Sequence, residues 1–235
     1  MGFLKKFTKQ EISWMMYDWA NSAHSVIVVT ILPIFFDTVA GYTADSVSSM
    51  STWGFATSLA MAIVALAAPF LGVFGDIRGM RKKLFTAFLL LGVVSVAGLA
   101  FTPLMDFTSS TAAAGKVAML VLVLYILSTI GFDASCIYYD AFLTDVTTED
   151  RMDSVSTLGY GLGYIGGSTI PLLIFLIMNA VGVPMLTSLA IIFAITAVWW
   201  LVFSLPLLKN CEQTTGKPYE KGDIGASIKN VFTTM

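Results

Sequence analysis

GVFGDIRGMRKKL, residues 72–84, is a short basic turn broken by glycines, and it lies between two long apolar runs. Each flanking run is long enough to cross a bilayer, because about 20 apolar residues span ~30 Å of hydrocarbon. The turn is therefore predicted to be the tight loop of a membrane hairpin. Gly75 and Gly79 allow the backbone to turn sharply, and the basic residues between Arg78 and Lys83 are expected to hold the loop on the cytoplasmic side.

The composition agrees with a membrane protein. Hydrophobic residues make up 57% of the 235 residues and charged residues 12%, whereas an ordinary soluble domain carries about 25% charged residues. No basic face of the size that nucleic-acid binding needs is present, so no nucleic-acid partner is expected. Cys136 and Cys211 lie far apart and provide neither a disulfide framework nor metal-ligand spacing. We therefore predict no metal and no cofactor.

Six continuous apolar runs are predicted to be membrane-spanning helices. Lipid offers no partner to unpaired backbone groups, which favours helices, and the runs do not alternate as barrel strands do. The expected spans are Ser13–Phe36, Trp53–Phe74, Leu84–Met105, Val117–Leu143, Val155–Met178 and Met185–Leu208. The sequence thus predicts an all-α membrane protein with a cytoplasmic segment at 1–12, a six-helix bundle at 13–209 and a cytoplasmic linker at 210–235. Within the linker, Ile224–Met235 is expected to form a short amphipathic piece at the membrane face.

The positive charges predict the orientation. With the N-terminus inside the cell, every Lys and Arg except Lys116 falls on the cytoplasmic side, as the positive-inside rule requires. We therefore expect an integral protein of the plasma (inner) membrane with both termini in the cytoplasm.

Ionisable residues within the spans are candidates for function, because charge in hydrocarbon is costly. The first span carries one polar stripe, from Asp18 to Ser25, and the fourth carries another, from Thr129 to Asp140. Two facing stripes of this kind predict a water-filled path in which carboxylates bind a cation or carry a proton. The predicted substrate or proton path comprises Asp18, Asn21, Ser22, His24, Asp133 and Asp140.

The members of this set have alternative explanations. Asp18 and Asp140 lie near the cytoplasmic ends of their spans, where simple hydration explains them equally well. Asp133 lies about two helical turns deeper, and there we favour a functional role. His24 lies off the stripe; it is either a pH-sensitive group or, as we slightly favour, a satisfied interface histidine.

Glycines recur at every fourth position in the fifth span. Gly159, Gly163 and Gly167 place a smooth groove on one helix face, where another helix can approach closely. Helix packing is the expected role of this groove.

The opening turn resembles a known motif. Gly72, Asp76, Gly79, Arg81 and Lys82 are similar to the loop between the second and third spans of the major facilitator superfamily. Further similar stretches are 17–23, Trp53 with 68–72, and glycine-rich positions within 155–167. Together they resemble the bacterial branch related to the vacuolar amino-acid effluxers of fungi.

This resemblance implies a fold and a latch. Superfamily members consist of two six-helix halves, each built from two three-helix repeats, and this sequence resembles the N-terminal half with the start of the central linker. Asp76 would touch a helix of the other half. Arg81 would pair with Asp140 or Asp145, and the loop would then latch the outward-open state.

Some residues depart from the family pattern. His24 stands where Tyr is usual, Asp140 where Asn is usual and Thr144 where Pro is usual. The extra acid could alter proton coupling or the charge of the substrate.

The favoured function is secondary transport of a small solute, such as an amino acid, by alternating access, with or without a coupled proton. Its partners would be the lipid bilayer and a C-terminal six-helix half or another copy. One alternative is a non-transporting assembly partner or a gene fragment. An intramembrane aspartyl protease is less favoured, because the nearest motif, at Gly72–Asp76, has the wrong spacing and lies in a loop. We therefore expect no enzymatic activity.

Overall fold

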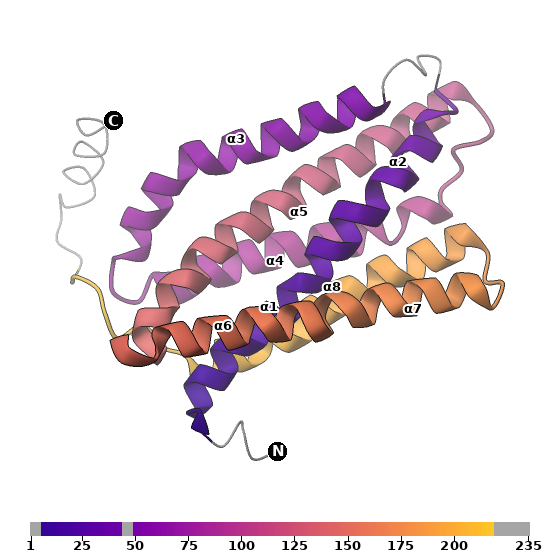
Figure 1. Ribbon diagram of the computed structural model, residues 1–235. Coiled ribbons are helices and arrows are strands. Elements are labelled where there is room, and N and C mark those ends of the chain that lie inside the picture. Colours follow the sequence, from indigo (N-terminus) through magenta and orange to yellow (C-terminus); the bar gives the residue numbers. More distant parts are fainter. Residues whose placement is uncertain (1–5, 44–48, 219–235) are drawn as a thin grey trace.

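The computed structural model describes residues 6–43 and 49–218, and within them six helical segments are long and apolar enough to cross a membrane (Figure 1). This confirms the six predicted spans and the all-α membrane fold. The elements are α1 (Lys9–Val26), η2 (Ile27–Ile31), α2 (Leu32–Ala40), α3 (Ser49–Gly75), α4 (Arg81–Leu99), η4 (Thr102–Leu104), α5 (Thr111–Val146), η5 (Glu149–Arg151), α6 (Met152–Leu162), η6 (Gly163–Ser168), α7 (Thr169–Ala180) and α8 (Met185–Asn210). The amphipathic piece predicted at Ile224–Met235 lies outside the described residues.

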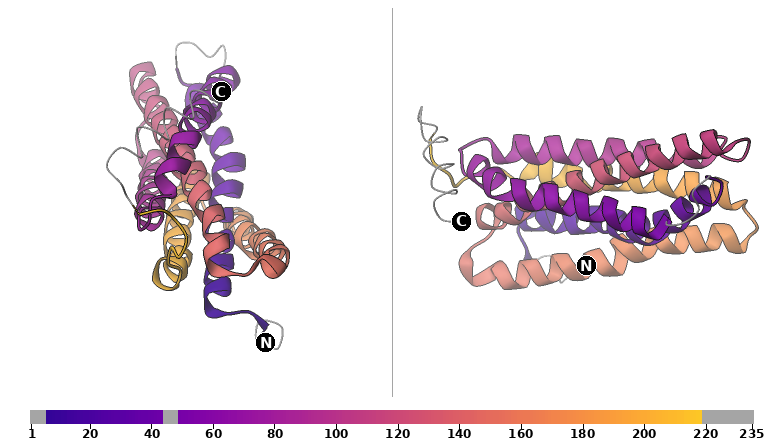
Figure 2. Two further views of the ribbon diagram at one scale, coloured as in Figure 1. Left: turned by 90° about the vertical axis from the view of Figure 1, so that its left-hand side faces the viewer. Right: turned by 90° about the horizontal axis from the view of Figure 1, so that it is seen from above.

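The six segments run along one long axis (Figure 2). α8 packs between α1 and α4, and α5 packs against α4 and α3. α6 and η6 lie along α1, so that α3 and the α6–α7 segment occupy opposite margins (Figure 1). α1 also reaches across to α5, and this crossing brings the two predicted polar stripes together.

Two spans change helical pitch in the middle, and a proline follows each change. η2 in the first span and η6 in the fifth are π-helical turns. Pro33 and Pro171 follow them, and the carbonyls four residues earlier, at Val29 and Gly167, lie inside the π turns. A proline lacks an N–H and clashes with that carbonyl, and a wider turn relieves the clash.

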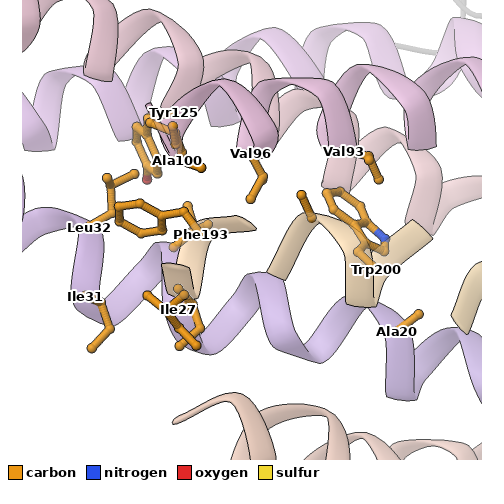
Figure 3. Close-up of a cluster of buried hydrophobic side chains, with 14 of the residues drawn as sticks. Ala20, Ile27, Ile31, Leu32, Val93, Val96, Ala100, Tyr125, Phe193 and Trp200 are labelled. Atoms are coloured by element: carbon orange, nitrogen blue, oxygen red, sulfur yellow. The ribbon is translucent and has the colours of Figure 1, made fainter. Parts of the chain in front are cut away.

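Trp200 of α8 is a completely buried member of the hydrophobic core (Figure 3). Gly92 of α4 leaves room for its ring, since a Cβ at Gly92 would collide with it. The Trp200 indole N–H donates to the hydroxyl of Tyr17 over 3.4 Å, and that hydroxyl is 2.7 Å from Oγ of Ser135. These contacts join α1, α5 and α8 at the middle of the bundle.

Candidate functional site

The polar face of α1 meets α5 through a tyrosine. The Tyr139 hydroxyl donates a hydrogen bond to Oδ2 of Asp18 over 2.9 Å, and its ring stacks on Trp14 with centroids 4.3 Å apart. Further along α1, Nδ2 of Asn21 donates to Sγ of Cys136 over 3.8 Å. We call the region where the two helices meet the polar seam. It comprises Asp18, Asn21, Asp133, Cys136, Tyr139 and Asp140.

Three carboxylates of the seam act electrostatically on the thiol of Cys136. Asp18, Asp133 and Asp140 each interact electrostatically with it, and Asp18 also interacts with Asp140. Asp140 is exposed, whereas Asp18 and Asp133 are half-buried. Among the described residues, none of these three acids forms an ion pair with a Lys or an Arg. Carboxylates without a fixed counter-charge can take up a proton or bind a cationic group.

The side chains of the seam offer proton uptake by the carboxylates and hydrogen bonding by Asn21 and Tyr139. In the part of the chain that the structure describes, no group of three His, Cys, Asp or Glu side chains is placed to hold a metal ion.

Ser22 belongs to the predicted stripe but faces the fifth span. A Cβ added to Gly163 would lie 2.6 Å from Oγ of Ser22, and the Ser168 hydroxyl donates to the Ser22 carbonyl over 3.3 Å. A Cβ at Gly159 would lie 2.8 Å from Oδ2 of Asp18. At Gly167 it would collide with the α1 backbone. The glycine groove therefore packs directly on α1, beside the polar seam.

His24 lies in a helix interface rather than in the seam. Its side chain is 2% exposed, and its ring stacks on Phe132 with centroids 4.8 Å apart. Nε2 is 3.3 Å from Oγ of Ser128, whereas Nδ1 is buried without a hydrogen-bond partner. The ring is therefore only half satisfied, and a role for it in the path stays a prediction.

The basic loop is fastened to the end of α5. Arg81 forms an ion pair with Asp145 and donates from Nη1 to the Ala141 carbonyl over 3.0 Å. Its partner is thus Asp145 and not Asp140, the other acid that the resemblance offered. The side chains of the pair are 5% and 0% exposed, whereas that of Asp76, 3.9 Å from Arg81, is 80% exposed.

The other motif residues shape the same loop. Gly79 has φ +80°, a conformation that favours glycine. Gly72 lies in α3, and a Cβ there would meet nothing within 4 Å. Lys82 donates from Nζ to the Cys211 carbonyl over 3.1 Å. The latch role of these residues stays a prediction.

A buried charged cluster was missed by the sequence reasoning. Glu11 of α1 is 1% exposed and receives two hydrogen bonds from Arg151, at 2.8 and 2.9 Å. Thr147 donates to the same carboxylate over 2.6 Å. Thr8 and Glu11 form a capping box, which the sequence does signal. No local signal indicates the pairing with Arg151.

Comparisons with known proteins agree with this architecture. The family model described as "Vacuole effluxer Atg22 like" matches residues 42–235. The "Uncharacterized MFS-type transporter YxiO" of Bacillus subtilis (strain 168) is 41% identical over 240 residues. That match covers 99% of this chain and 53% of the relative, so the chain spans about half the length of that protein.

Proposed function

This chain belongs to the family of Atg22-like vacuole effluxers, and from that premise we propose that it forms the N-terminal half of a secondary transporter. The half would move a small solute by alternating access, rocking against a second six-helix bundle. The support for a second bundle is that the similar bacterial transporter is about twice as long as this chain. The second bundle would come from a continuation of the same polypeptide, from another copy of this chain or from a different chain.

The polar seam is the observation that carries this proposal. Asp18 and Asp133 are half-buried carboxylates without an ion-pair partner among the described residues, which is the arrangement that proton carriers in transporters use. We propose that they exchange the coupled proton and that Asn21 and Asp140 contact the solute, with Ser22 and His24 supporting the same helix. An amino acid is the proposed solute, because its ammonium group complements the carboxylates and its carboxylate complements the Asn21 amide.

The membrane orientation follows from the basic loops. We propose that both termini and the Gly72–Leu84 loop face the cytoplasm of a cell whose plasma membrane contains the protein. The loop, with Asp76 directed outward and Arg81 held by Asp145, would latch the outward-open state.

We further propose that the protein is not a protease. An aspartyl protease needs two carboxylates that share a proton. The acid of the nearest protease-like motif, Asp76, is exposed beside Arg81 rather than paired with Asp140. Asp140 interacts with Asp18 of the seam instead. A solute path that shares a proton among seam residues accounts for this arrangement better than peptide hydrolysis does.

Flux measurements in proteoliposomes test the proposal. The protein is reconstituted with a pH-sensitive dye inside, a pH gradient is imposed and amino acids are supplied in turn. We expect solute-dependent proton movement in the wild type and its loss in Asp133→Asn. The control, Asp106→Asn, changes a turn residue whose Oδ1 accepts from the backbone of Thr108, a bond that asparagine keeps.

Two results would contradict the proposal. Flux and pH dependence that are the same in Asp133→Asn as in the wild type would remove the proton role of the seam. A wild type that moves no amino acid would instead favour the non-transporting assembly partner.

A further inference from the structure

The chain turns back onto the bundle after α8. Residues 211–218, which we call the strap, lie along the loop between α3 and α4. The Lys217 N–H donates to the Asp76 carbonyl, and the Arg78 N–H donates to the Lys217 carbonyl, both over 3.0 Å. These bonds form a parallel β-bridge between Ile77 and Lys217. The strap therefore fixes the backbone of the loop that carries Asp76.

Close contact between the strap and the loop requires a glycine in the strap. Gly216 has φ +124°, a conformation that side chains rarely adopt. A Cβ there would lie 2.8 Å from the Asp76 carbonyl oxygen and 2.8 Å from Nε2 of Gln213. Any other residue at this position would push the strap away from the loop.

Gln213 satisfies the backbone at both helix ends that the loop joins. Its Nε2 donates over 3.0 Å to the carbonyl of Gly75, the last residue of α3. Its Oε1 accepts from the N–H of Gly79 over 2.8 Å and from that of Arg81, the first residue of α4, over 3.3 Å. Helix ends leave such groups without partners, and the N-cap residue of α4, Met80, provides no side-chain bond. Gln213 thus caps two helices from more than 130 residues away.

Asp145 of α5 provides a second connection between the strap and the bundle. Its Oδ1 accepts from the backbone N–H and the hydroxyl of both Thr214 and Thr215, at 2.8–2.9 Å, while Oδ2 pairs with Arg81. The Thr215 hydroxyl also accepts from Arg81 Nη1 over 3.3 Å. A buried ion pair is stable only when its remaining hydrogen-bonding capacity is used. The strap supplies partners to Asp145 and to Nη1 of Arg81, whereas Nε of Arg81 is buried without a hydrogen-bond partner. These bonds join the loop, the strap and α5.

We propose that Gln213 is a positioning residue for the Gly72–Leu84 loop and that the strap is the device through which it acts. Gln213 and the strap hold the loop backbone rigid, while the Asp76 carboxylate, 80% exposed and 3.9 Å from Nη2 of Arg81, stays accessible to a docking element. The consequence for transport rests on the proposed function. The consequence for the loop backbone does not.

Hydrogen exchange of the loop amides tests the positioning role directly. In the protein reconstituted in nanodiscs, Gln213→Ala should accelerate exchange at Gly79 and Arg81 by roughly tenfold, the size expected for the loss of one or two hydrogen bonds. Gly216→Ala should have the same effect, because its Cβ would clash with both the Asp76 carbonyl oxygen and Nε2 of Gln213. Glu212→Gln, an exposed neighbour, is the matched control and should leave exchange unchanged. Gln213→Glu keeps the acceptor for the Gly79 and Arg81 amides but sets an oxygen against the Gly75 carbonyl, so it should restore their protection only in part.

Transport kinetics test the consequence. Gln213→Ala should lower kcat roughly fivefold with KM unchanged, because the seam is intact. In an Asp76→Asn background it should have little further effect, because both changes act through one carboxylate.

The exchange experiment and the transport experiment each have a result that would contradict the proposal. Unchanged loop exchange in both Gln213→Ala and Gly216→Ala overturns the positioning role, whatever the flux. Additive losses in the Asp76→Asn background also overturn it. A wild type without flux refutes the proposed function. The hydrogen-exchange measurement still shows whether Gln213 and the strap position the loop.

Discussion

At the residue scale, Tyr139 is the side chain that holds the seam together. Its hydroxyl bonds to Asp18 while its ring stacks on Trp14, so Tyr139→Phe removes the hydrogen bond and keeps the packing. We expect a loss of about 1–3 kcal/mol in the free energy of unfolding, typical of a hydrogen bond to a charged group. The rate of solute flux should also fall, because Asp18 loses the donor that orients it.

The same helix offers a matched control for this change. Tyr125 also stacks on a tryptophan, Trp53, and its hydroxyl lies 2.9 Å from that of Thr57. Tyr125→Phe should destabilise the bundle by about 0.5–1.5 kcal/mol, typical of a hydrogen bond between neutral groups, but leave flux unchanged. Equal losses of flux in the two variants would show that Tyr139 serves stability alone.

Cys211, which follows α8, gives a prediction that depends on pH. Burial raises the pKa of its thiol from 9.0 to about 12, so the thiol is neutral in the folded protein over the whole physiological range. Because the folded pKa is the higher one, the stability that the neutral thiol contributes is complete below pH 9 and is lost as the pH rises toward 12. At pH 9, alkylation by iodoacetamide should be at least roughly a hundredfold slower in the folded than in the unfolded protein.

Peptide mass spectrometry resolves the labelling at Cys211 from that at Cys136. The denatured chain at the same pH provides the reference rate. Similar rates in the folded and the denatured chain at pH 9 would contradict the burial of this thiol against the carbonyl of Gln10, 3.6 Å away.

At the element scale, the contact between η6 and α1 is set by missing side chains. A Cβ at Gly163 would lie 2.6 Å from the Ser22 hydroxyl and 3.1 Å from the Asp18 carbonyl, whereas one at Gly161 would meet nothing within 4 Å. Gly163→Ala should therefore destabilise the protein by about 1–3 kcal/mol, the usual effect of overpacking. Gly161→Ala should be neutral or stabilise by up to ~1 kcal/mol through helix propensity.

Thermal unfolding of the two alanine variants in the same detergent measures this difference. The expected order of Tm is Gly161→Ala equal to or above the wild type, with Gly163→Ala below it. A Gly163→Ala protein as stable as the wild type would mean that η6 can move away from α1 without loss of packing.

The helices themselves were predictable, but their ends were less so. Apolar runs locate the six spans because lipid demands them. The fourth helix nevertheless begins at Thr111 rather than Val117, and the fifth segment begins at Glu149 rather than Val155. The added residues, TAAAGK at 111–116 and EDRMDS at 149–154, are mostly small or polar, so hydropathy gives no signal for them. The π turns were not predicted, although Pro33 and Pro171 mark their positions.

At the scale of the whole molecule, the sequence indicated which residues to examine but not how they pair. Acids within the spans are conspicuous because charge in a membrane is costly, and so Asp18 and Asp133 could be named in advance. Asp145 was named only through the family resemblance, as one of two possible partners of Arg81. Gln213 caps helices from across the chain, and Glu11 meets Arg151 140 residues away. Such pairings depend on how the helices pack, and a single sequence contains no periodic signal for them.

The central claim is that the seam between α1 and α5 borders water rather than lipid, and cysteine accessibility at position 133 tests it most directly. Asp133→Cys is made in a Cys136→Ser background and exposed in intact membranes to a charged, membrane-impermeant methanethiosulfonate. The control, Ala134→Cys, lies at a position only 1% exposed and should stay inert. The account predicts rapid modification at position 133. The claim would be contradicted if the charged reagent left the cysteine at position 133 unmodified while a lipid-soluble maleimide labelled it readily.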